Sequence, residues 1–141
     1  PNMRPLDGGR ITSGYGFRLH PVYGTFEFHS GIDIAAERNT PVAATARGKV
    51  IFTGWVEGYG NLVIIDHGFN YGTYYGHLNK ILCKQGDKVE RGKLIGLVGD
   101  TGTSTGYHLH YEVRFNGKTV NPAKYLDPDN YFASKKENFL R

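Results

Sequence analysis

The sequence predicts an all-β, mainly antiparallel domain with very little helix. Glycine makes up 20 of the 141 residues, alongside ten tyrosines and eight phenylalanines. Aromatic residues favour strands, and glycine favours the tight turns that join them. No segment keeps a sustained 3.6-residue apolar period, which argues against long helices. Several apolar, β-branched segments also have glycine close to their ends, as strands do.

Three expected strands share this apolar, β-branched character: residues 49–55, 61–66 and 108–115. Residues 68–72 form a predicted turn, and residues 73–78 are the expected strand that returns from it. Asn116-Gly117 predicts a two-residue hairpin leading into Lys118-Thr119-Val120. Only residues 122–126 are expected to form a helical turn.

Two segments repeat one pattern. Residues 41–50 and 86–96 are both short strand–turn–strand units with glycine at the bend. The second is similar to the hammerhead of lipoyl and biotinyl carrier domains. No lysine flanked by methionine stands at a hairpin tip, so a swinging-arm carrier is not expected. The repeated pattern predicts a compact sandwich-like or barrel-like domain of the duplicated hybrid type.

Charge, hydropathy and cysteine content exclude several functions. Seventeen basic against thirteen acidic residues give a net charge of +4, and the basic residues are scattered, so no nucleic-acid partner is expected. No run approaches the roughly 18 apolar residues of a transmembrane helix. A single cysteine, Cys83, excludes an internal disulfide, and its apolar neighbours indicate a structural thiol.

Six histidines are present, and two of them form a pair in a predicted strand. Side chains alternate along a strand, so His108 and His110 project to the same face, with Cα atoms about 7 Å apart at a rise of ~3.3 Å per residue. Two imidazoles this close can serve one metal centre, one as a ligand and the other beside it. The alternative is two exposed polar positions on an alternating strand.

His29 and Asp33 add a second imidazole position and a carboxylate. Asp33 stands between Ile32 and Ile34, where a carboxylate is unfavourable unless it is paired or bound to a metal. Gly31 permits a bend that would bring His29 and Asp33 to one point. On its own, His-x-x-x-Asp is a weak pattern, and a structural aspartate in a turn is the alternative.

Together these residues suggest a zinc site. Two imidazoles and one carboxylate are a usual protein set for catalytic Zn²⁺, with the fourth tetrahedral position left to water. No His-Glu-x-x-His segment occurs, so the helical zincin arrangement is excluded. Proton transfer then falls to His77 or to the remaining histidine of the pair.

The histidine segments, taken in order, resemble the M23 peptidases, zinc endopeptidases of the lysostaphin and LytM type. The matching motifs are His29-x-x-x-Asp33, His77 in Tyr-Gly-His-Leu, and Gly-Tyr-His108-Leu-His110. Supporting matches are Ser13-Gly14-Tyr15-Gly16, Arg18-x-His20-Pro21, residues 60–68 and 101–106, and Asn121-Pro122. The resemblance covers about residues 11–125. It implies one peptidase domain over residues 1–141, with residues 126–141 as a C-terminal tail.

The resemblance also implies roles for individual residues. His29, Asp33 and His110 match the zinc ligands of the family, and His77 and His108 match its catalytic residues. The implied fold is antiparallel β with the metal in a groove, and the implied substrate is the peptide part of bacterial peptidoglycan.

Substrate contacts can be assigned less directly. Arg18 is suited to hold a substrate carboxylate, and Asn61 and Tyr23 are candidates to line the groove, although ordinary turn roles fit them equally well. The polar run over residues 99–106 is expected to form one groove wall. The Arg-x-His-Pro segment resembles that of family members which open stem-peptide cross-links between D-alanine and a diamino acid. A glycyl-bridge endopeptidase is the alternative.

The resemblance further predicts an extracytoplasmic bacterial protein of the periplasm, the cell wall or the secreted fraction. The chain begins at Pro1, so we expect a processed form in which an upstream regulatory or inhibitory segment has room to cover the groove. Two other readings compete: a metal-free phosphotransferase carrier acting through a histidine pair, and a non-catalytic peptidoglycan-binding module.

Overall fold

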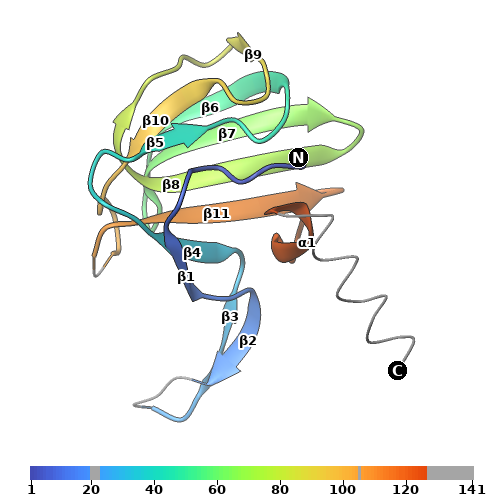
Figure 1. Cartoon of the computed structure of the whole chain (residues 1–141). Coiled ribbons are helices and arrows are strands. Elements are labelled where there is room, and N and C mark those ends of the chain that lie inside the picture. Colours follow the sequence, from blue (N-terminus) through green and yellow to red (C-terminus); the bar gives the residue numbers. More distant parts are fainter. Residues whose placement is uncertain (20–22, 105, 127–141) are drawn as a thin grey trace.

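The computed structural model describes residues 1–19, 23–104 and 106–126 and, within them, is almost entirely β (Figure 1). The strands are β1 (Arg10–Ser13), β2 (Gly16–Leu19), β3 (Phe26–His29), β4 (Ile32–Ala35), β5 (Pro41–Ala43), β6 (Gly48–Val56), β7 (Gly60–Gly68), β8 (Tyr71–Ile81), β9 (Lys88–Val89), β10 (Leu94–Val98), β11 (His108–Phe115) and β12 (Lys118–Val120). A single helical turn, α1 (Ala123–Leu126), follows. The predicted all-β antiparallel class is confirmed. Apart from Leu126, the expected tail lies outside the described residues.

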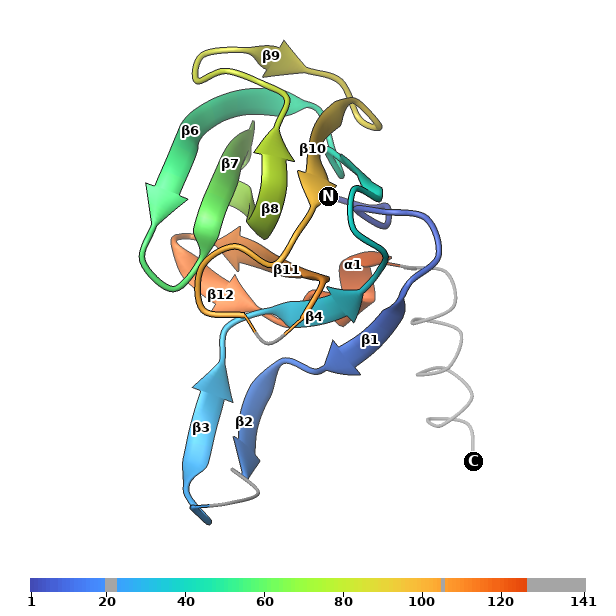
Figure 2. The ribbon, with the colours of Figure 1, turned by 90° about the vertical axis from the view of Figure 1, so that its left-hand side faces the viewer.

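Ten of the described strands form one sheet, in which every pairing is antiparallel. Its main path runs β1-β4-β11-β8-β7-β6-β9, with β12 beside β11 and with β10 joining β8 to β5. Figure 2 shows how strongly the sheet curves, with β6, β7, β8 and β10 wrapping the upper part and β11, β4 and β1 below. The two repeated segments pair with each other, since β5 pairs with β10 and β6 with β9.

The turns follow the chemistry of their residues. Asn116 and Gly117 both have positive φ and close the β11–β12 hairpin, as the sequence predicts. Phe69 and Asn70 also have positive φ and close the β7–β8 hairpin within the predicted turn. The long antiparallel strands β11, β8 and β7 therefore lie side by side in the centre of the sheet, next to the site.

The core lies inside the curved sheet and contains a buried hydroxyl cluster. Tyr75 and Tyr111 are fully buried, and their rings lie 5.5 Å apart. The Thr45 hydroxyl lies 2.9 Å from the hydroxyl of Tyr111 and 3.2 Å from that of Tyr75. Cys83 packs partly buried against this core, and burial raises the pKa of its thiol to about 11, as expected for a structural thiol.

A separate hairpin of β2 and β3 projects from the body of the molecule (Figure 2). Phe17 faces Phe28 across its strands, with the rings 5.1 Å apart, and the Phe17 side chain is 76% exposed. The neighbouring pair, Gly16 and His29, lies on the opposite face because side chains alternate. His29 thus ends β3 where the hairpin meets the main sheet.

None of the helices in the described residues has the length and apolar character needed to cross a membrane.

Candidate active site

The turn between β3 and β4 and the adjacent strand β11 bring His29, Asp33 and His110 together. In β4, Ile32 and Ile34 are buried, so the alternating Asp33 side chain points out of the core. Asp33 is paired directly with His110 across the β4–β11 ladder.

Gly31 makes this turn possible. A Cβ atom at position 31 would collide with the carbonyl oxygen of Tyr111 and approach the Glu112 side chain to 2.9 Å. Only glycine therefore lets the turn lie this close to β11. The bend that the sequence predicts at Gly31 is present.

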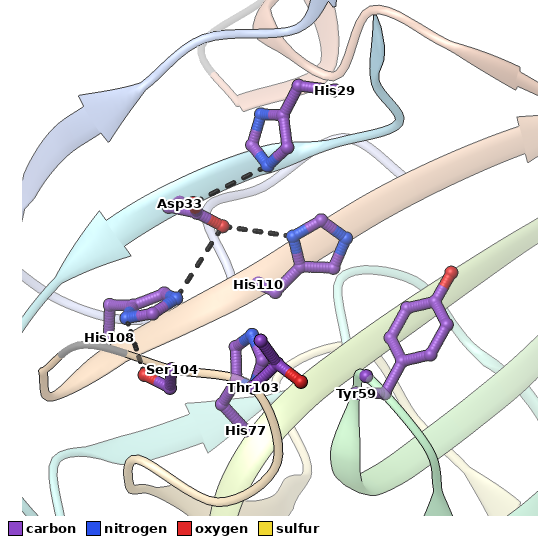
Figure 3. A pocket seen from close by; sticks show the side chains of 9 residues that line it. His29, Asp33, Tyr59, His77, Thr103, Ser104, His108 and His110 are labelled. Atoms are coloured by element: carbon purple, nitrogen blue, oxygen red, sulfur yellow. Dashed lines mark hydrogen bonds and ion pairs between the residues drawn. The ribbon is translucent and has the colours of Figure 1, made fainter. Parts of the chain in front are cut away.

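One possible ligand atom from each of these three side chains lies within 4.8 Å of the other two. Nε2 of His29 is 3.4 Å from Oδ2 of Asp33, and Nδ1 of His110 is 2.9 Å from Oδ1 of Asp33 (Figure 3). The three side chains thus converge on one point, as the sequence predicts.

Hydrogen bonds on the far side of each imidazole determine which nitrogen faces this point. Nδ1 of His29 lies 2.7 Å from the carbonyl oxygen of Gly14, which can only accept, so Nδ1 carries the proton and Nε2 has the free lone pair. Nε2 of His110 lies 3.0 Å from the Glu112 carboxylate, which leaves Nδ1 toward the cluster. Two imidazole lone pairs and one carboxylate fit a tetrahedral zinc ion.

His108 lies beside this cluster on the same face of β11. Its Nδ1 donates to the carbonyl oxygen of Gly106 at 2.9 Å, and its Nε2 is 3.8 Å from Oδ1 of Asp33. The Ser104 hydroxyl lies 3.2 Å from the same Nδ1 (Figure 3). The paired histidines therefore face one point, as strand alternation predicts.

His77 reaches the site through a bulge in β8. Between the pairs Asn61–Leu78 and Val63–Tyr75, β7 has one residue where β8 has two, and His77 takes a positive φ of 60° there. Such a bulge turns a side chain to a new direction. The His77 ring centre thereby comes within 4.7 Å of that of His108.

Burial and charge act differently on these groups. Burial alone would raise the pKa of Asp33, but hydrogen bonds from His110 and His29 outweigh it and hold the pKa well below the usual range. Burial alone would lower the pKa of His110, but hydrogen bonds to Asp33 and Glu112 raise it to about 9. For His77, burial is the main effect and lowers the pKa.

Glu112 is a site residue that sequence reasoning missed. It is fully buried, and its carboxylate accepts hydrogen bonds from Ser30 at 2.5 Å, Tyr59 at 2.7 Å and Nε2 of His110 at 3.0 Å. Burial alone would raise its pKa, but hydrogen bonds from His110, Ser30 and Tyr59 lower it to about 2. Its position two residues after His110, on the same strand face, is the signal that could have found it.

The converging side chains line a groove of about 400 Å³. Its lining residues are His29, Asp33, Gly58, Tyr59, His77, Thr103, Ser104, His108 and His110. Thr103 and Ser104 belong to the polar run over residues 99–106, so this run forms part of the wall, as expected. Burial and the neighbouring Glu112 raise the pKa of Tyr59 to about 12, so its hydroxyl keeps its proton.

Of the three predicted substrate-binding residues, Asn61 and Tyr23 are not among the residues that line this groove, and the Arg18 side chain lies outside the described part of the chain. The Asn61 amide donates to the carbonyl oxygen of Leu78 at 3.0 Å, and Asn61 is not among the described lining residues. Tyr23 is 76% exposed near the tip of the β2–β3 hairpin. Arg18 lies in β2, but its side chain, like His20 and Pro21, is outside the described part. Substrate binding by all three stays a prediction.

A β-sheet groove with two imidazoles and a carboxylate at one point is an arrangement typical of metal-dependent hydrolases. Comparison with known families agrees: residues 27–122 match the model of peptidase family M23, and the chain belongs to this family.

Named relatives and solved structures extend the match beyond these residues. The chain is 48% identical over 127 residues to the DD-carboxypeptidase/endopeptidase Mpg of Neisseria meningitidis, covering 90% of this chain and 29% of the relative. It is 46% identical over 135 residues to the peptidoglycan DD-endopeptidase ShyA of Vibrio cholerae, covering 94% and 31%. A crystal structure of a zinc-containing peptidase from Vibrio cholerae superposes with a TM-score of 0.79 at 43% identity, covering 85% of this chain and 38% of that one. The chain thus spans less than a third of the length of these curated relatives.

Proposed function

We propose that this chain is the catalytic part of a zinc-dependent endopeptidase that hydrolyses peptide cross-links of bacterial peptidoglycan, at the bond between D-alanine and a diamino acid. One observation carries the proposal: ligand atoms of His29, Asp33 and His110 lie within 4.8 Å of one another in a groove that His77 and His108 also line. Family membership and the DD-endopeptidase names of the relatives support the substrate and the bond.

The three converging side chains would hold the zinc ion through Nε2 of His29, the Asp33 carboxylate and Nδ1 of His110. A bound zinc ion supplies a Lewis acid that polarises a peptide carbonyl and lowers the pKa of water toward ~7. Because Asp33 keeps its charge over the whole neutral range, it stabilises a cation in this groove.

His77 and His108 supply proton transfer and hydrogen bonds to the reacting peptide. Each is held in one tautomer by a backbone carbonyl, Thr101 for His77 at 2.6 Å and Gly106 for His108 at 2.9 Å. Nε2 of each ring is therefore free to accept a proton, and once protonated it can donate to the carbonyl oxygen or the leaving amine.

The proposal extends to the surroundings of the chain. We infer that residues 1–141 form one peptidase domain with its core at about residues 11–125, and that the protein acts outside the cytoplasm, where peptidoglycan lies. In a longer chain, an upstream regulatory or inhibitory segment would have the open groove available to it. The similarity to relatives more than three times as long supports the inference that this domain belongs to a longer chain.

Digestion of purified peptidoglycan tests the function and identifies the bond together. The chain, loaded with zinc, is incubated with peptidoglycan carrying direct D-alanyl–diamino acid cross-links, and in parallel with glycine-bridged peptidoglycan. We expect new D-alanine carboxyl ends and free amines on the diamino acid, identified by mass, in the first substrate only. A chelator should abolish the release, and added zinc should restore it.

Other outcomes separate the alternatives. Release of glycine termini would support the glycyl-bridge reading instead. Binding to peptidoglycan without any new termini, with or without zinc, would contradict the peptidase proposal and favour a binding module.

A further inference from the structure

A buried carboxylate lies directly beside the proposed metal ligands. Glu112 is 0% exposed and comes two residues after His110 on β11, so both side chains project to the same face. Burying a charged carboxylate away from water is strongly unfavourable unless hydrogen-bond donors surround it. The hydrogen-bond donors around Glu112 therefore indicate how its buried charge is stabilised and which segments it connects.

Five hydrogen bonds from four residues surround this carboxylate. Oε1 accepts from the Ser30 hydroxyl at 2.5 Å, the Tyr59 hydroxyl at 2.7 Å and Nε2 of His110 at 3.0 Å. Oε2 accepts from Nε and Nη2 of Arg114, at 3.2 and 2.9 Å. These donors come from the β3–β4 turn, the β6–β7 turn and β11 itself.

Each of these segments also contains, or is hydrogen-bonded to, a residue of the proposed site. Ser30 directly follows His29, and β11 carries His110. The carbonyl oxygen of Tyr59 accepts a hydrogen bond from the backbone N–H of His77 at 2.7 Å. The ring centre of Tyr59 is 5.6 Å from that of His110. Glu112 thus connects the segments that bring two ligands and one catalytic histidine to the groove.

We propose that Glu112 is the positioning residue of the metal site: it keeps the proton of His110 on Nε2, so that Nδ1 stays free as a ligand, and it fastens the turn that presents His29. The inference rests on the proposed function, because it takes His110 as a zinc ligand. Partners of this kind orient the ligating imidazole and raise its basicity.

An ionised carboxylate is the only side-chain group of this shape that satisfies all the donors. Arg114 can only donate, so a glutamine at position 112 would turn its oxygen to Arg114 and its amide N–H groups to His110. His110 would then have to accept at Nε2 and carry its proton on Nδ1, where the ligand lone pair is needed. With the amide reversed, its N–H groups would face the N–H groups of Arg114.

Zinc affinity and the His110 tautomer test this inference in the whole chain. The zinc dissociation constant is measured by chelator competition for the wild type, Glu112→Gln, Glu112→Asp and Ser30→Ala. Glu90→Gln makes the same change at an exposed position and is the matched control. ¹⁵N spectra of the histidine side chains in the zinc-free proteins, recorded above pH 9 where His110 is neutral, report which nitrogen carries the proton.

We expect Glu112→Gln to weaken zinc binding by about 10- to 100-fold, the usual cost of losing such a partner, and to remove the Nε2-proton signal of His110. Glu112→Asp keeps the charge but shortens the reach to His110, so it should give a smaller loss. Ser30→Ala should weaken binding while leaving the His110 signal in place. Glu90→Gln should match the wild type in both measurements.

The outcomes that overturn the inference differ from those that overturn the proposed function. Wild-type zinc affinity in folded Glu112→Gln, with the His110 proton still on Nε2, would refute the role of Glu112 alone. If Glu112→Gln does not fold, Glu112→Asp and Ser30→Ala decide: unchanged affinity in both refutes it. A wild-type chain that binds no zinc would refute the proposed function itself.

Discussion

Nδ1 of His77 lies 2.6 Å from the carbonyl oxygen of Thr101, and this contact decides which nitrogen of the ring faces the groove. A carbonyl oxygen accepts but never donates, so Nδ1 carries the proton and Nε2 presents its lone pair. The chain supports His77 further through its backbone N–H, which donates to the carbonyl oxygen of Tyr59. Two loops therefore hold one imidazole in a single orientation.

Replacing His77 by alanine should remove most turnover while leaving zinc bound. General acid–base groups contribute roughly 10²- to 10⁴-fold to rate, so we expect kcat to fall within that range. Because His77 is not among the three converging ligands, the zinc content should match the wild type. Metal analysis and peptidoglycan release are measured on the same preparation. Near-normal turnover would show that His77 has no part in the chemistry.

The acid limb of the pH profile should lie below the usual histidine range. Burial disfavours the charged imidazolium of His77 and lowers its pKa below 6.5, so the neutral ring persists as pH falls. A proton acceptor must be neutral, and kcat/KM should therefore stay level around pH 7 and decline only below about 6.5. Zinc content is checked at each pH to separate this effect from metal loss. A limb that persists in the residual activity of His77→Ala would assign it to another group.

Replacing Asp33 by asparagine should abolish tight zinc binding. The variant keeps the shape but loses the charge that two histidines contact in the cluster. We expect the zinc dissociation constant to rise by more than the roughly 100-fold cost of losing an outer partner. Chelator competition measures this, with Asp7→Asn at an exposed position as the control. Equal affinities in the two variants would exclude Asp33 as a ligand.

Gly31→Ala should destabilise the fold, because its methyl group would meet the carbonyl oxygen of Tyr111 and the Glu112 side chain. Overpacking of this kind typically costs about 1–3 kcal/mol in the free energy of unfolding. Gly14→Ala is the matched control, since a Cβ atom there meets nothing within 4 Å. Urea unfolding of both variants measures the difference, and equal midpoints would mean that the turn can move away from β11.

Thr45→Val should cost more stability than Tyr111→Phe. The Thr45 hydroxyl is the one hydrogen-bond partner of the Tyr111 hydroxyl among the described residues, and both side chains are fully buried. Valine would leave that hydroxyl unsatisfied, at about 1–3 kcal/mol, whereas phenylalanine removes the polar group at about 0.5–1.5 kcal/mol. Thermal and urea unfolding measure both. The reverse order would indicate that Tyr111 finds another partner.

Local patterns were enough to predict the long strands and most of the ligand cluster. Alternation placed His108 and His110 on one face, and the apolar neighbours of Asp33 indicated that its carboxylate needed a partner. The Asn-Gly turn and the glycine-closed segments predicted the hairpins. These features depend on residues close together in the sequence, where strand geometry alone relates side chains.

The parts that escaped prediction depend on distant pairings. The bulge that turns His77 into the groove arises from a shift in the β7–β8 register, which no local pattern encodes. Glu112 gains its importance from Ser30 and Tyr59, which lie 82 and 53 residues away in the sequence. The β2–β3 hairpin leaves phenylalanines exposed, contrary to the burial on which strand prediction from apolar patterns depends.

The three converging side chains belong to two different sheets. His29 ends the projecting hairpin, whereas Asp33 and His110 are paired within the main sheet. An ion held by all three would cross-link the hairpin to the main sheet, so that metal binding would also restrain the hairpin against the body. The occupancy of the metal site and the orientation of the hairpin would then be coupled. A distance probe on the hairpin could follow metal binding without any substrate.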